Sequence, residues 1–226
     1  MNCELIDSMG TDLTVVNAAR VSFDKESDWL DLGGAEGTSG HSLSMKDIKL
    51  ISYLATHNHW TPFSHVQITM RETVPIFVAR QRFKHVVGFT YNEISRRYVD
   101  SPPDFFYPKE WRRTADNKKQ GSSDEAHQDT EYFSKEYKEF ISDAQSFYEA
   151  LIRDGVAPEQ ARMVLPQSMY TSYYVTGSLA AWARAYNLRS EEHAQKEIRD
   201  LTDQWTTVIG SIPELKHSWQ ALTLTS

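Results

Sequence analysis

The spacing of apolar residues predicts several helices and a smaller number of strands. The clearest pattern covers residues 133–151, where apolar side chains recur mostly three or four positions apart and form one stripe along a helix. Gly155 ends this pattern, and Pro158 is suited to the start of the next helix. The capping-box sequence Ser44–Asp47 precedes another helical pattern that ends near Thr56.

Two segments have the character of strands, and each is followed by a helical pattern. Apolar and polar residues alternate over 66–71, and the run 170–176 is rich in Tyr, Thr and Val. Pro75 suits the first position of a helix that continues to Lys84. Ser178 predicts the cap of a helix ending near residue 188, and Ser190 predicts the cap of a further helix. The apolar face of that last helix consists of Ala194, Ile198, Leu201, Trp205 and Ile209.

Two other segments show neither the helical spacing nor the alternation of a strand. Three prolines and a polar run interrupt every pattern over 99–126, and long loops of this kind are often functional. The segment Gly33–Gly40 predicts a flexible loop, since it lacks the Gly-Lys-Ser/Thr ending of a phosphate-binding loop. Helices and strands are mixed without regular βαβ alternation, so the sequence predicts an α+β fold. No linker divides it, and we expect one domain over residues 1–226.

Composition limits the classes of function. The 226 residues are 40% hydrophobic and carry a net charge of −7, which is typical of a globular domain and argues against a sequence-independent nucleic-acid binder. No apolar run reaches the ~20 residues that a membrane span requires, and the N-terminal residues do not resemble a signal peptide, so a cytoplasmic location is expected. Cys3 is the sole cysteine and has no basic neighbour to activate it, which favours a structural thiol.

A histidine-rich stretch lies between the helix ending at Thr56 and the strand over 66–71. His57, His59 and His65 could ligate zinc, but no nearby carboxylate or thiolate completes a ligand set. We therefore expect hydrogen-bonding loop histidines and no metal site.

A cationic stretch favours an anion site. Solvated helix faces account for most charge runs, yet this density of cations on an acidic chain needs a reason. Arginine binds phosphate oxygens in bidentate fashion, and a serine hydroxyl such as that of Ser95 can complete a phosphate site. Another arginine, Arg189, stands at a helix junction, where the usual role is structural. The five cations of the stretch are Arg80, Arg82, Lys84, Arg96 and Arg97.

Taken together, these stretches resemble the flavin-dependent thymidylate synthases. Seven segments follow the order and nearly the spacing of that family, and they cover most of 14–100 and 157–200. Each segment alone is weak, whereas seven in order are specific. They are Ala18–Ser22, His59–His65, Arg80–Gln81 with Asn92–Tyr98, Ala161–Pro166, Tyr170–Tyr173, Leu188–Arg189 and His193–Ile198.

The resemblance implies an α+β fold with a mainly antiparallel sheet flanked by long helices. It also implies reductive methylation of dUMP to dTMP, with methylenetetrahydrofolate as carbon donor and without a cysteine nucleophile. FAD reduced by NADPH would carry the hydride, which no side chain can supply. Relatives form homotetramers in which each site draws on several subunits.

The resemblance also assigns residues. Arg189 corresponds to the arginine that faces the uracil and favours ionisation at N3, and His59 orients substrate or flavin. The family's Arg-His-Arg signature is Lys84-His85-Val86 here. The dUMP-binding positions are Gln81, Lys84, Glu93, Ser95, Arg97, Arg162 and Arg189. The flavin-binding positions are His59, Thr61, Lys84, His85, Val86, Ser178, Arg184 and His193.

Two alternatives stay open at this point. One is a catalytically silent nucleotide-binding protein of the same fold, and the other is a zinc hydrolase built on His57, His59 and His65. A flavin absorbance spectrum separates both from the first interpretation.

Overall fold

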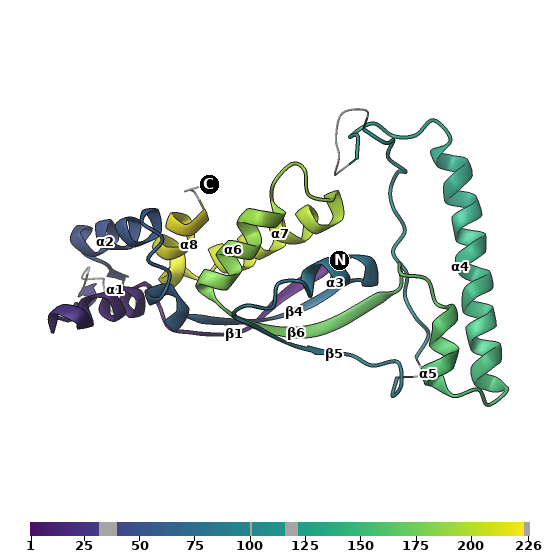
Figure 1. The fold of residues 1–226 in the computed structure, drawn as a ribbon, viewed down its shortest axis with the longest axis horizontal. Coiled ribbons are helices and arrows are strands. Elements are labelled where there is room, and N and C mark those ends of the chain that lie inside the picture. Colours follow the sequence, from purple (N-terminus) through teal and green to yellow (C-terminus); the bar gives the residue numbers. More distant parts are fainter. Residues whose placement is uncertain (32–39, 100, 116–121, 224–226) are drawn as a thin grey trace.

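The centre of the molecule is a four-stranded antiparallel sheet (Figure 1). The structure is a computed structural model that describes residues 1–31, 40–99, 101–115 and 122–223. The strand order is β1-β4-β6-β5, and every neighbouring pair is antiparallel. The predicted α+β fold with an antiparallel sheet is therefore confirmed. The strands are β1 (Asn2–Met9), β4 (Gln67–Pro75), β5 (Phe89–Glu93) and β6 (Tyr170–Ser178).

The central strands β4 and β6 match the predicted strand segments and extend them to Pro75 and Ser178. Alternate side chains of β4, including Ile68, Met70 and Val74, are fully buried, as the alternation over 66–71 predicts. Because the strand continues beyond the predicted segment, Glu72 also falls on this buried face.

Three helices pack over the buried face of the sheet: α3 (Ile76–Arg82), α6 (Leu179–Arg189) and α7 (Lys196–Gly210) (Figure 1). The indoles of Trp182 and Trp205 pack edge to face at 5.4 Å and fill the space between helices and sheet. The Trp182 indole N–H donates to the backbone carbonyl of Ile68, which fixes α6 against β4.

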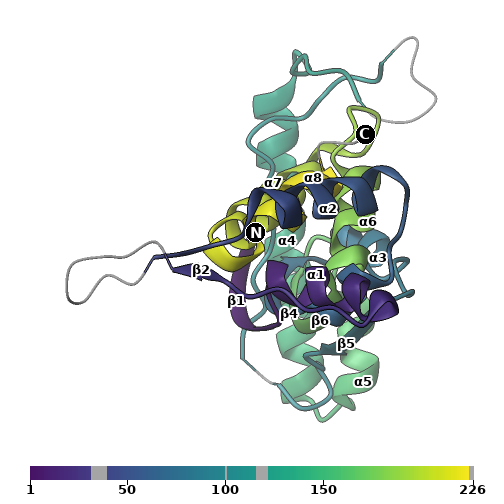
Figure 2. The ribbon, with the colours of Figure 1, turned by 90° about the vertical axis from the view of Figure 1, so that its left-hand side faces the viewer.

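The remaining helices lie at the two ends of the sheet. Helices α1 (Asp12–Arg20), α2 (Met45–Thr56) and α8 (Lys216–Thr223) gather at one end, which faces the viewer in Figure 2. Helices α4 (Thr130–Arg153) and α5 (Pro158–Ala161) stand at the other end. Short elements complete the fold: β2 (Leu30–Asp31), β3 (His41–Ser42), and 3₁₀ turns over Val21–Phe23, Pro62–His65, Arg162–Val164 and Pro213–Leu215.

Most predicted helix boundaries agree with the structure. The Ser44 and Ser178 hydroxyls accept backbone N–H groups and cap α2 and α6. The side chain of Asp47 does not close the predicted box onto the Ser44 backbone, because its carboxylate binds Arg20 at 2.6 Å as well as nearby hydroxyls. Gly155 follows α4 with φ of +83°, a left-handed conformation that glycine adopts without steric cost.

Two predicted helix starts are wrong. Pro75 is the last residue of β4, with ψ of 149°, so α3 begins after it. Ser190 ends α6 because its N–H donates to Tyr186, and α7 begins only at Lys196.

The irregular stretch predicted over 99–126 forms no helix or strand in its described part and makes two isolated bridges. The predicted loop Gly33–Gly40 lies outside the described residues except for Gly40. None of the helices in the described ranges is long and apolar enough to cross a membrane.

Candidate active site

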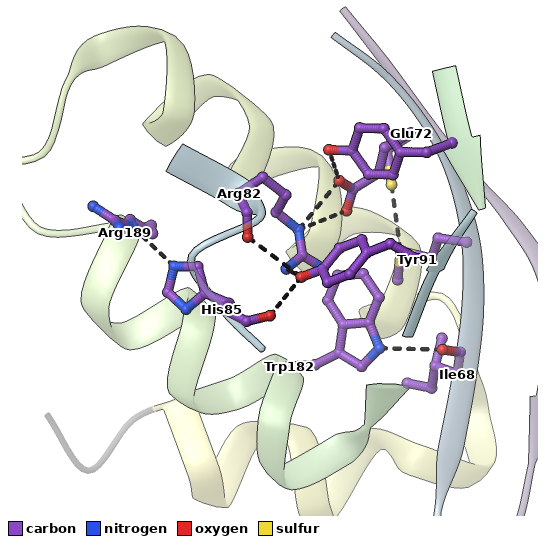
Figure 3. Close-up of polar contacts among 10 residues, drawn as sticks. Ile68, Glu72, Arg82, His85, Tyr91, Trp182 and Arg189 are labelled. Atoms are coloured by element: carbon purple, nitrogen blue, oxygen red, sulfur yellow. Dashed lines mark hydrogen bonds and ion pairs between the residues drawn. The ribbon is translucent and has the colours of Figure 1, made fainter. Parts of the chain in front are cut away.

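A buried ion pair underlies the part of the chain that carries the predicted cationic stretch. The Arg82 guanidinium is fully buried, and its Nε donates to Glu72 Oε2 at 3.2 Å (Figure 3). Tyr173 donates to the same carboxylate oxygen at 2.5 Å. The Arg82 Nη1 donates to the Tyr91 hydroxyl at 2.6 Å. The guanidinium also lies within 4.3–5.2 Å of four ring centroids, those of Phe89, Tyr91, Trp182 and Trp205.

Arg82 therefore belongs to the core, and counting it among the cations of an anion site was wrong. A charge without solvent needs a paired partner, and the inward position of Glu72 on β4 supplies it. Burial raises the pKa of Tyr91 to about 12 and raises that of Tyr173 well above its ordinary value, so both phenols remain hydrogen-bond donors.

The buried pair anchors an exposed turn after α3. The Tyr91 hydroxyl lies 2.7 Å from the carbonyl oxygen of His85, to which it donates. Gly88 closes the turn with φ of +80°, and its carbonyl accepts the backbone N–H of Ser178. This turn carries the exposed side chains of Lys84 and Val86. It contains Lys84-His85-Val86, the segment that corresponds to the Arg-His-Arg signature.

Arg189 meets this turn from the C-terminal end of α6. Its Nε donates to His85 Nε2 at 2.9 Å (Figure 3). Burial, followed by the charges of Arg189, Arg82 and Arg184, lowers the pKa of His85 to about 4. His85 is therefore neutral near pH 7, with Nε2 as acceptor and the proton on Nδ1. Arg184 completes the group because its Nη2 donates to the Val87 carbonyl at 2.5 Å.

A second group of predicted substrate residues lies around a cavity of about 460 Å³ at the far end of β5. Glu93 and Arg162 both line it, and Thr171 donates to Glu93 Oε1 at 2.6 Å. Arg97 follows on the same segment, and its backbone N–H donates to the Ser95 hydroxyl at 3.3 Å. Neither Arg189 nor Lys84 lines this cavity, so the predicted substrate residues do not share one pocket within the described chain.

The other predicted flavin positions are more dispersed. His59 and Thr61 are exposed in the loop after α2, where the His59 ring stacks 6.0 Å from Tyr53. His193 is exposed and lies 3.6 Å from Glu192. Ser178 is buried, and its hydroxyl accepts the backbone N–H of Ala181 as the cap of α6. No group of three or more His, Cys, Asp or Glu residues suited to a metal occurs in the described part of the chain.

The thiol of Cys3 is not activated. It is buried in the core, 3.3 Å from Met70 Sδ. Burial and the nearby carboxylate of Glu72 raise its pKa, so a thiolate is disfavoured. This agrees with the predicted structural role.

Sequence reasoning missed the partners that position these groups. Glu72 could have been found, since it continues the inward alternation of Ile68 and Met70 and an inward carboxylate needs a partner. Tyr91 gave no signal, because no strand was predicted over residues 89–93.

Comparison with known proteins identifies the family. The family profile described as "Thymidylate synthase complementing protein" matches residues 4–213. A protein of Thermosipho africanus named flavin-dependent thymidylate synthase is 36% identical over 219 residues, which covers 95% of this chain and 86% of that protein. Another of the same name, from Thermotoga neapolitana, is 34% identical over 96% of this chain and 87% of its own length.

The chain belongs to the flavin-dependent thymidylate synthase family. A solved relative with a similar fold is the UMP/dUMP methylase PolB from Streptomyces cacaoi, bound with 5-Br dUMP. Its TM-score is 0.81 at 27% identity, with 99% of this chain and 94% of that chain covered. The predicted family and fold are thus confirmed.

Proposed function

We propose that the protein is a flavin-dependent thymidylate synthase that methylates dUMP to dTMP. The observation that carries this proposal is the Arg189 guanidinium, held by a neutral His85 beside the exposed Lys84–Val86 turn. The sequence resemblance assigns the family's catalytic arginine and flavin signature to these positions.

The residues of this turn fit FAD. Its pyrophosphate is an anion, and two exposed cations are available: Lys84 on the turn, and Arg184, which donates to the turn's Val87 carbonyl. Val86 and Val87 are 65% and 68% exposed and offer an apolar surface for a ring. Bound FAD would supply the hydride that no side chain can provide. We include His59, Thr61 and His193 in the cofactor site on the family match alone. Ser178 would support the turn through its backbone N–H, which donates to the Gly88 carbonyl.

The protein's own side chains would bind dUMP and polarise its pyrimidine ring. Arg189 would donate hydrogen bonds to the uracil ring and stabilise negative charge on it. His85 accepts from Nε of Arg189, so the remaining guanidinium donors are free to face the substrate. Ser95, Arg97 and Arg162 would hold the phosphate, and Glu93 would lie at the same nucleotide site.

We further propose methylenetetrahydrofolate and NADPH as co-substrates and a homotetramer as the assembly. The separation of Arg162 from Arg189 supports shared sites, since two subunits could bring the two groups together. Exposed aromatic side chains on α4 also support an oligomer. The cytoplasmic location stays a prediction.

The visible absorbance spectrum of the purified protein tests this function. We expect a flavin spectrum that NADPH bleaches. A colourless protein that binds dUMP would instead support the silent nucleotide binder. Stoichiometric zinc, with activity lost to a chelator, would support the hydrolase.

A further inference from the structure

One cation of the predicted cationic stretch has no role in the family resemblance, yet it lies among the substrate residues. This residue is Arg96, which lines the cavity of about 460 Å³ at the end of β5. It is half-buried, whereas its neighbour Arg97 is exposed and has its guanidinium 5.3 Å from the centre of the Tyr98 ring. Of these two adjacent arginines, Arg96 is the one that lines the cavity.

A second arginine lines the same cavity from another element. Arg162 begins the 3₁₀ turn that follows α5, and β5 and α5 lie at the same end of the molecule (Figure 1). Arg96 Nη1 donates to the carbonyl of Ser101, and Arg162 Nε donates to the carbonyl of Glu159 at 3.3 Å. Neither arginine forms an ion pair with a carboxylate of the described residues. Two such cations at one cavity favour an anionic ligand.

Two carboxylates, those of Glu93 and Asp104, also line this cavity. The Thr171 hydroxyl donates to Glu93 Oε1 at 2.6 Å, and Glu93 Oε2 accepts no hydrogen bond from the described residues. Carboxylates repel a phosphate but accept hydrogen bonds from hydroxyl groups. A cavity that offers both guanidinium donors and carboxylate acceptors therefore suits a sugar phosphate better than a simple inorganic anion.

We propose that Arg96 is a further phosphate-binding residue that, together with Arg162, makes the site select a nucleoside monophosphate over the unphosphorylated nucleoside. The inference rests on the proposed function, because that function supplies dUMP as the ligand. The Ser101 carbonyl holds one side of the Arg96 guanidinium, and its Nε and Nη2 have no partner among the described residues. Adjacent N–H groups of a planar guanidinium can bond two phosphate oxygens at once, so these donors suit the phosphate.

The test measures dissociation constants of dUMP and deoxyuridine for the flavin-loaded protein and its Arg96→Met variant. Methionine keeps an unbranched apolar stem but removes the charge and every N–H donor. We expect dUMP to bind at least about tenfold more weakly. Deoxyuridine should bind as it does to the wild type, because it has no phosphate. Arg113→Met is the matched control, since Arg113 is exposed and pairs with Glu125, and both ligands should bind it as they bind the wild type.

A second variant guards against a folding defect. Arg96→Gln keeps an N–H donor for the Ser101 carbonyl but has no charge, and it should show the same selective loss of dUMP affinity. Unchanged dUMP affinity in a folded variant, or equal weakening of both ligands, overturns the inference. Arg96 would then only hold its loop to Ser101, and the proposed function would stand. Wild-type protein that does not bind dUMP overturns the proposed function itself, and this inference with it.

Discussion

At the scale of single residues, the hydrogen bond between Arg189 and His85 gives a flexible side chain a defined direction. His85 lies on a turn that the Tyr91 hydroxyl holds, and this turn is fixed to the core by Arg82. The guanidinium is thus oriented before the substrate binds. Orientation of this kind matters because a fixed donor stabilises developing charge without reorganisation.

Arg189→Lys should reduce dTMP formation by about two orders of magnitude. The lysine keeps a positive charge but lacks the planar fork that can bond His85 and the pyrimidine together. Flavin reduction by NADPH without dUMP should change little, because it needs no uracil. Rates of the two half-reactions are to be measured separately on folded, flavin-loaded protein. Equal loss in both, together with lower thermal stability, would make Arg189 a structural residue.

Cys3→Ala should leave dTMP formation nearly unchanged. The wild-type thiol is buried, and its raised pKa disfavours the thiolate, so no step depends on it. The free energy of unfolding should fall by about 1 kcal/mol through lost packing. Steady-state rates and urea denaturation check both statements. Loss of activity in a folded, flavin-containing variant would restore Cys3 as a nucleophile.

At the scale of elements, helices and strands with a regular apolar period could be predicted from the sequence. The elements that were predicted wrongly or missed each have a physical cause. The alternation over 66–71 and the stripe over 133–151 each produced the expected element, β4 and α4. Ser190 failed as a cap because its N–H continues the bonding of α6, which no local pattern reveals. Strand β5 was missed, since its residues are half-buried or exposed and its strand conformation depends on pairing with β6 far along the chain.

The same contrast holds for the site. Family motifs gave Arg189 and His85, but the hydrogen bond between them joins residues 104 positions apart and needed the fold. In the sequence, Arg82 looked like one more surface charge in a cationic stretch. The rings that enclose it come from β5, α6 and α7, which only the fold brings together.

The buried ion pair between α3 and β4 should be costly to break. Arg82→Met leaves Glu72 buried without its ionic partner, and we expect the free energy of unfolding to fall by about 3–5 kcal/mol. Arg113→Met is the control, because its ion pair with Glu125 is exposed and should contribute less than about 1 kcal/mol. Urea denaturation of both variants gives the comparison. Similar small losses would mean that the pair does not stabilise the fold.

At the scale of the whole molecule, exposed apolar side chains on α4 bear on the proposed oligomer. Helix α4 turns Ile141 and Tyr148 inward, whereas Phe140 and Phe147 are each 56% exposed. The predicted stripe is therefore only partly covered within this chain. A second copy would cover such a face and could complete a site whose residues lie in two groups.

Mixed oligomers test whether sites are shared. Arg162→Ala and Arg189→Ala should each be nearly inactive alone, since each removes a cation proposed to contact dUMP. Co-expression should restore about a quarter of wild-type activity, because random mixing leaves that share of sites with both arginines. A mixture as inactive as either variant would place both arginines of a site on one chain.

Single-turnover conversion of dUMP tests the central claim most directly. Protein with pre-reduced flavin is mixed, without oxygen, with dUMP and methylenetetrahydrofolate, and dTMP and flavin absorbance are followed together. The proposed function predicts dTMP in an amount equal to the flavin that is reoxidised. Bound dUMP with flavin that stays reduced and no dTMP would contradict it.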